Sequence, residues 1–122
     1  MVNNFIFVFI GGAAGASLRY LFYLSIPKVG GFPLSTLVVN ILGSLFFGFI
    51  FNLSSYRSDN WVHYLLLAGI AGAFTTFSTF SFESVDLLLS KKFLQAFSYM
   101  FLSLSLCLLF TFLGLNITKL IN

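Results

Sequence analysis

The chain has 122 residues, of which 59% are hydrophobic and 7% are charged, with a formal net charge of +3. A soluble domain has about 25% charged residues, so this composition excludes one and predicts an all-α integral membrane protein facing lipid. The basic residues form no run that would bind nucleic acid. The single cysteine, Cys107, excludes a disulfide within the chain.

Four apolar segments account for almost the whole chain, which leaves room for only one domain, residues 1–122. A helix that spans a bilayer needs about 20 apolar residues. The predicted spans are residues 5–26, 34–53, 61–89 and 93–118, and polar or proline-containing turns separate them.

The third segment is too long for one simple crossing, and it contains the sequence GAFTTFSTFSF at residues 72–82. Its hydroxyl-bearing and β-branched residues are weak helix formers. We therefore expect a break within residues 72–76. Backbone carbonyls freed by such a break are tolerated in a membrane only where protein, water or an ion satisfies them.

Small residues recur at four-residue spacing in the first three spans, which allows helix backbones to approach closely. We expect most of these positions to serve packing within one bundle, without excluding a packed dimer. They are Gly11 with Gly15, Gly12 with Ala16, Ser44 with Gly48, and Ala68 with Gly72.

The charges in the predicted loops are nearly balanced across the membrane. Arg57 and Lys119 lie on one predicted side, and Lys28, Lys91 and Lys92 lie on the other. The orientation of a membrane protein follows the difference in Lys and Arg number between the loops on its two sides. A difference of one residue gives almost no preference. Two interpretations stay open: a fixed topology set by a weaker signal, or dual topology with oppositely inserted copies forming an antiparallel pair.

Several polar side chains fall within the spans. Arg19 either snorkels, so that its guanidinium reaches the membrane interface, or faces a water-filled vestibule, where it would attract anions. Asn40 either bonds a neighbouring helix or donates its amide hydrogens to an anion. Tyr99, Ser103 and Cys107 share one helix face, although hydroxyls in a helix also bond back to their own backbone.

The remaining titratable residues give no candidate for enzyme chemistry. Glu83 and Asp86 lie near the end of the third span and are interpreted as solvated helix-end charges. His63 is interpreted as an interfacial residue without a specific role. The sequence contains no metal-ligand cluster, nucleophile–base pair or phosphate-binding loop.

Three motifs give the chain a specific resemblance. It resembles the CrcB/Fluc fluoride channels over almost its whole length, through GGAAGASLRY, STLVVNILGS and GAFTTFSTFSFE. The resemblance implies a dual-topology homodimer in the bacterial cell inner membrane. That dimer would export fluoride from the cytoplasm through two antiparallel pores.

The resemblance also implies roles for individual residues. Phe77, Phe80 and Asn40 correspond to pore residues, and Tyr99 and Ser103 to a polar track in the fourth span. Arg19 would lie near a vestibule. Gly72 and Thr75 correspond to residues whose carbonyls hold a central structural sodium ion, Na⁺.

Two other classes of protein remain as alternatives. One is a small four-span multidrug or cation exporter, which relies on an acidic residue in its first span. Here that span has no acidic residue, and its only charge is Arg19. The other is a membrane assembly subunit that transports nothing, which would not need a hydroxyl-rich break.

Overall fold

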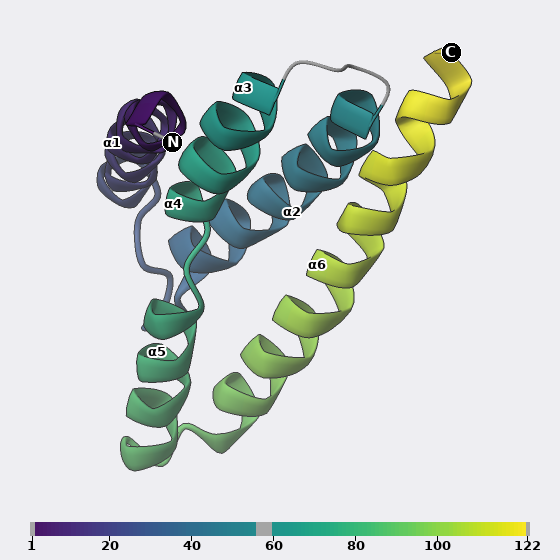
Figure 1. Cartoon of the computed structure of the whole chain (residues 1–122). Helices are drawn as coiled ribbons and strands as arrows, with labels where there is room; N and C mark the ends of the chain where they lie inside the picture. The colour runs from purple at the N-terminus through teal and green to yellow at the C-terminus, as the bar shows by residue number, and fades with distance from the viewer. Residues whose placement is uncertain (1, 56–59, 122) are drawn as a thin grey trace.

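The computed structural model describes residues 2–55 and 60–121. It contains α1 (Val2–Ser25), α2 (Leu34–Ser55), α3 (Asn60–Val62), a π-helix η1 (His63–Ala71), α4 (Gly72–Phe74), α5 (Phe77–Leu89) and α6 (Phe93–Ile121) (Figure 1). Within the described residues, four helical stretches are long and apolar enough to cross a membrane: Asn3–Ser25, Leu34–Leu53, His63–Leu89 and Phe93–Leu120. The prediction of an all-α protein with four spans is confirmed.

The third span is not one helix. Its chain runs through α3, η1 and α4, becomes extended at Thr75 and Thr76, and continues as α5 (Figure 1). Thr75 has φ −75° and ψ 157°, and Thr76 has φ −151° and ψ 115°. The expected break is therefore confirmed and limited to these two residues, which we call the break. The π-helical stretch before it was not expected.

Glycines allow the helices to pack closely in two places. On α1, Gly11 and Gly15 lie against the backbone of η1, where an added Cβ would collide with carbonyl oxygens. On α2, Gly48 lies equally close to the carbonyl oxygen of Thr111 in α6. The packing prediction holds for these glycines, whereas Gly12 and Gly72 have no such neighbour from another helix in this chain.

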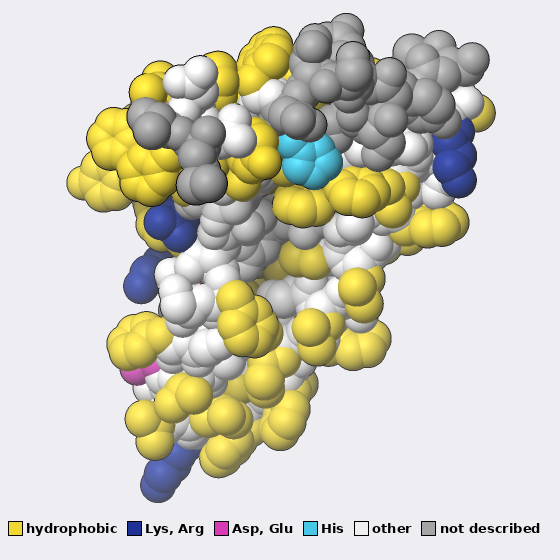
Figure 2. Space-filling model, in the orientation of Figure 1, with side chains coloured by type: hydrophobic (Ala, Val, Ile, Leu, Met, Phe, Trp, Pro, Cys, Tyr) yellow, Lys and Arg dark blue, Asp and Glu magenta, His cyan; other side chains and the backbone are white. Residues whose placement is uncertain are grey.

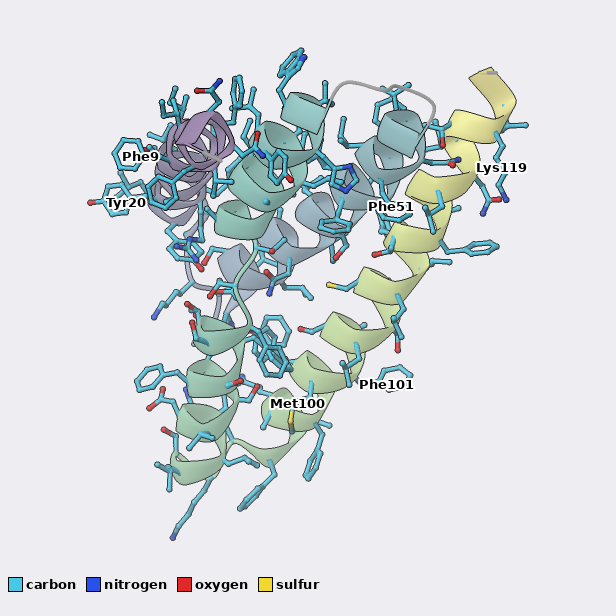
Figure 3. The ribbon with its side chains drawn as sticks, in the orientation of Figure 1. Phe9, Tyr20, Phe51, Met100, Phe101 and Lys119 are labelled. Atoms are coloured by element: carbon cyan, nitrogen blue, oxygen red, sulfur yellow. The ribbon has the colours of Figure 1, made fainter. Side chains whose placement is uncertain are left out.

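The outer surface is strongly apolar. Figure 3 shows Phe9 and Tyr20 on α1 and Phe101 on α6 projecting away from the bundle, and these side chains are 71%, 62% and 69% exposed. Hydrophobic side chains cover much of the visible face, and the basic side chains lie at its margins (Figure 2). Such a surface is stable only where lipid or another apolar surface covers it.

The buried core is small and lies where α2, α5 and α6 meet, around Leu37, Leu87, Ala96 and Tyr99. The loop-charge comparison depends on Arg57, which lies outside the described residues. Dual topology therefore stays a prediction.

Candidate functional site

The side chain of Asn40 in α2 forms hydrogen bonds with the backbone of the break. Its Oδ1 accepts a hydrogen bond from the Thr76 backbone N–H at 2.8 Å, and its Nδ2 donates to the Thr76 carbonyl at 3.1 Å. The interhelical hydrogen bond considered for Asn40 is thus present. Because a side-chain amide has two N–H groups and this pairing uses one, the other is left for a further acceptor.

The break also diverts two backbone donors from their helical partners. In a continuous α-helix, the N–H of Thr76 would bond to the Gly72 carbonyl, and that of Thr79 to the Thr75 carbonyl. Instead, the Thr76 N–H donates to Asn40, and the Thr79 N–H donates to the Thr76 hydroxyl at 3.2 Å. The backbone carbonyls of Gly72 and Thr75, which are predicted to bind sodium, therefore lack these two helical N–H donors.

A cavity of about 310 Å³ lies beside the break, between α2, α5 and α6. Its lining includes four of the five predicted pore residues and several further polar side chains. The lining residues are Asn40, Gly43, Ser44, Phe47, Thr75, Thr76, Phe77, Phe80, Ser103, Leu104, Cys107, Leu108 and Thr111. We call this space the central cavity.

Ser103 is the most informative of these lining residues. Its side chain is 5% exposed, and its hydroxyl oxygen is buried without a hydrogen-bond partner among the described residues. A buried polar group without a partner is costly, and most are satisfied by protein or by a bound species. The Ser103 hydroxyl therefore keeps the capacity to donate a hydrogen bond at the wall of the central cavity.

Two phenylalanines form the α5 side of the cavity. The rings of Phe77 and Phe80 have centroids 5.5 Å apart and are tilted by 43°, as their three-residue spacing predicts. Phe77 is 74% exposed in the single chain, whereas Phe80 is partly buried and packs 5.3 Å from the Tyr99 ring. Phe82 is 72% exposed and does not line the cavity.

Tyr99 differs from the other predicted pore residues because it does not line the central cavity. It is fully buried, and its hydroxyl donates to Glu83 at 2.8 Å. The Thr36 hydroxyl donates to the other Glu83 oxygen at 3.0 Å. The interpretation of Glu83 as a solvated helix-end charge is therefore wrong, because α2 and α6 each supply it with a donor. Asp86 is exposed, as expected.

Arg19 of α1 lines a second cavity, also of about 310 Å³, together with hydroxyl-bearing residues of α1 and of the break and α5. The lining residues are Ala16, Arg19, Tyr20, Tyr23, Thr76, Ser78 and Thr79. Thr76 lines both cavities, so both border the break. The vestibule role of Arg19 stays a prediction.

A feature of α2 was missed in the sequence. Thr36, Asn40 and Ser44 lie four residues apart, so they share one helix face in the same way as the stripe on α6. Four-residue spacing of polar residues was noticed on the fourth span only, and the same signal on the second span would have found this stripe. Asn40 and Ser44 of α2 line the central cavity together with Ser103 and Cys107 of α6, so the two polar faces lie on the same cavity.

The fold and the site together define a class of protein: a multi-pass α-helical membrane protein with cavities between its spans that polar side chains line in part. Residues 6–115 match the family described as CrcB-like protein, Camphor Resistance (CrcB). The chain belongs to this family.

Individual relatives agree over nearly the full length. A protein of Hahella chejuensis named fluoride-specific ion channel FluC is 39% identical over 124 residues, which cover 98% of each chain. A protein of the same name from Shewanella sp. strain W3-18-1 is 43% identical over 117 residues, covering 93% of this chain and 94% of the relative. Another, from Ignicoccus hospitalis, is 38% identical. By the names of its members, the family is one of ion channels and not of enzymes.

Proposed function

We propose that the chain is a fluoride-selective channel that exports fluoride from the cytoplasm across the cell inner membrane. The observation that carries the proposal is the buried hydroxyl of Ser103, which has no hydrogen-bond partner among the described residues and lines the central cavity together with Asn40. The relatives, named fluoride-specific ion channels, give the anion its identity.

The chemistry of the cavity suits a small anion. Fluoride is strongly hydrated, so a pore must replace the lost water with hydrogen-bond donors. Ser103 offers a hydroxyl, and Asn40 offers its second amide N–H. Aromatic rings have a positive edge, so Phe77 and Phe80 provide weak partners for the anion while keeping the passage narrow and dry.

Arg19 supplies the entry to this path. An arginine in the second cavity attracts anions and repels cations, because the Coulomb interaction is strong in the low dielectric of a membrane. Thr76 lines both cavities, so the path we propose runs from Arg19 past the break to Asn40.

The functional unit we propose is an antiparallel homodimer with two pores. The ring of Phe77 is 74% exposed although it lines the central cavity, so the single chain does not complete the cavity wall. A second copy would complete it. In this dimer the Gly72 and Thr75 carbonyls of both copies would hold a structural Na⁺, which supplies a compact positive charge to oxygens without helical partners.

The composition of the two cavities argues against a cation exporter. Among the described residues that line them there is no Asp or Glu, and the charged residue present is Arg19. An assembly subunit without transport activity would have no use for the unpartnered Ser103 hydroxyl.

The test is efflux from liposomes that contain the purified protein, measured separately for fluoride, chloride and a cationic dye. A fluoride channel releases fluoride and retains the other two. Dye release would support the exporter, and no release of any of the three would support the assembly subunit.

A further inference from the structure

Gly43 of α2 leaves room for the side chain of Thr75 in the break. A Cβ added at Gly43 would collide with the Cγ2 methyl group of Thr75, and it would lie 3.1 Å from Cδ1 of Phe74. Gly43 is itself buried. Because glycine has no side chain, the break can lie directly against α2 at this position.

The methyl group of Thr75 cannot turn away from Gly43 without losing a hydrogen bond. The Thr75 hydroxyl donates to the Ala71 carbonyl at 3.0 Å, and the Thr75 backbone N–H donates to the same oxygen at 3.1 Å. A β-branched side chain has few χ1 rotamers, so the bond of the hydroxyl also fixes the direction of the methyl group. The preceding turn of the third span thus holds this methyl group against Gly43.

Phe74 closes the other side of the contact. Its ring packs edge-on against the ring of Phe22 in α1, with centroids 5.5 Å apart and an interplanar angle of 81°. A ring with α1 behind it has little room to retreat, because packed interiors contain few voids. The substitution Gly43→Ala would therefore displace the break itself and not only one side chain.

Gly43 and Asn40 act on the break from the same face of α2, since they are three residues apart. Asn40 bonds to both backbone polar groups of Thr76, and Gly43 receives the methyl group of Thr75. One helix face thus fixes both residues of the break, one by hydrogen bonds and the other by close packing. The ψ angle of Thr75, 157°, sets the direction of its carbonyl, so a displacement of Thr75 also turns that carbonyl.

We propose that Gly43 is a positioning residue for the Thr75 carbonyl, and thereby for the structural Na⁺ of the dimer. This inference rests on the proposed function, in which that carbonyl binds the ion. In this role Gly43 acts through Thr75, because it determines how closely the break approaches α2. The contact depends on one methyl group, so it can be tested by moving that group from one residue to the other.

The experiment compares three variants with the wild type. Gly43→Ala adds a methyl group at the contact, Thr75→Ser removes one while keeping the hydroxyl that bonds to Ala71, and the double variant does both. The fraction of dimer is measured by size-exclusion chromatography as sodium chloride replaces choline chloride. Each titration gives the sodium concentration at which dimer stability is half-maximal.

Gly43→Ala is expected to raise this half-maximal sodium concentration about tenfold, because one overpacked contact costs enough energy for such a change. Thr75→Ser alone should stay close to the wild type, and the double variant should return to the wild-type value. If Gly43→Ala forms no dimer at all, recovery of the dimer in the double variant is the expected result.

The matched control is Gly48→Ala on the same helix. There an added Cβ would collide with the Thr111 carbonyl oxygen of α6, so the same methyl group is placed against α6 instead of the break. This variant should lower the unfolding temperature without changing the half-maximal sodium concentration, and Thr75→Ser should not restore it.

Three results would overturn the inference. The first is an unchanged half-maximal sodium concentration in Gly43→Ala, and the second is a double variant no better than Gly43→Ala. The third is recovery of Gly48→Ala by Thr75→Ser, which would show that the exchange is not specific to this contact. A wild-type dimer that is indifferent to sodium would refute the proposed ion itself, and the inference with it.

Discussion

The side chain of Asn40 pairs with both backbone polar groups of Thr76, accepting from its N–H at 2.8 Å and donating to its carbonyl at 3.1 Å. One residue of α2 thus satisfies the backbone at the point where the third span stops being helical. The same amide lines the central cavity, so the site and the break depend on each other.

Asn40→Ala is therefore expected to lower both stability and flux. Without the amide, the buried N–H and carbonyl of Thr76 lose their partners, at a cost of about 1–3 kcal/mol for each unsatisfied group. Thermal unfolding in detergent and fluoride efflux measure the two effects. As a control, Asn116→Ala removes an exposed amide that donates to the Phe112 carbonyl of its own helix, and this change should have little effect. Equal behaviour of the two variants would contradict the pairing.

Replacing Phe77 or Phe80 by Ile separates a pore role from a packing role. Ile roughly preserves apolar bulk, so a packing residue should lose at most about 1.5 kcal/mol and keep its function. A pore residue should lose fluoride flux with the dimer intact, because Ile has no positive ring edge. Phe82→Ile is the control and should conduct normally. Full flux in both Phe77→Ile and Phe80→Ile would exclude these rings from the mechanism.

Tyr99→Phe tests the contact to Glu83. The change keeps the ring packing but removes a donor from a carboxylate in a membrane span, and a hydrogen bond to a charged group contributes about 1.5–3 kcal/mol. We expect a lower unfolding temperature and reduced flux. Asp86→Asn, at an exposed acid of the same helix, should leave both unchanged. If Tyr99→Phe is as stable and active as wild type, the hydroxyl is dispensable.

Two substitutions in the break distinguish its backbone from its side chains. Thr75→Ser should be mild, because the proposed sodium contact uses the carbonyl of residue 75. Thr76→Ala removes the side chain that caps α5 and should cost about 0.5–2 kcal/mol of stability. Dimer stability in size-exclusion chromatography, with sodium or choline as the cation, is the measurement. A dimer indifferent to the cation would argue against the structural Na⁺.

Dual topology predicts that one loop is labelled from both sides of the membrane. Ser90→Cys in a Cys107→Ser background places a single thiol in the exposed turn between α5 and α6 without changing the loop charge. Impermeant maleimide added to intact cells should label about half of the copies, and permeabilised cells should allow the rest to react. Labelling confined to one side would establish a fixed topology.

The sequence by itself determined the class of fold and the position of the break. Four long apolar segments leave a chain with nine charged residues no stable arrangement except spanning helices, since backbone groups in lipid must be satisfied within each segment. Thr75 and Thr76 could be recognised as weak helix formers from the sequence, because helix propensity is a property of the residue itself. That Phe77 and Phe80 lie on the same face of α5 likewise follows from their three-residue spacing alone.

Only the tertiary structure decided what the polar side chains do. No local pattern shows that Glu83 receives hydrogen bonds from Thr36 and Tyr99, because those donors come from helices distant in the sequence. Ser44 and Cys107 line the same cavity, and Gly48 lies close to Thr111 one turn further along, an arrangement that depends on how two helices pack. Spacing along one helix fixes the face on which a residue lies, but the neighbour of that face is fixed by packing between helices.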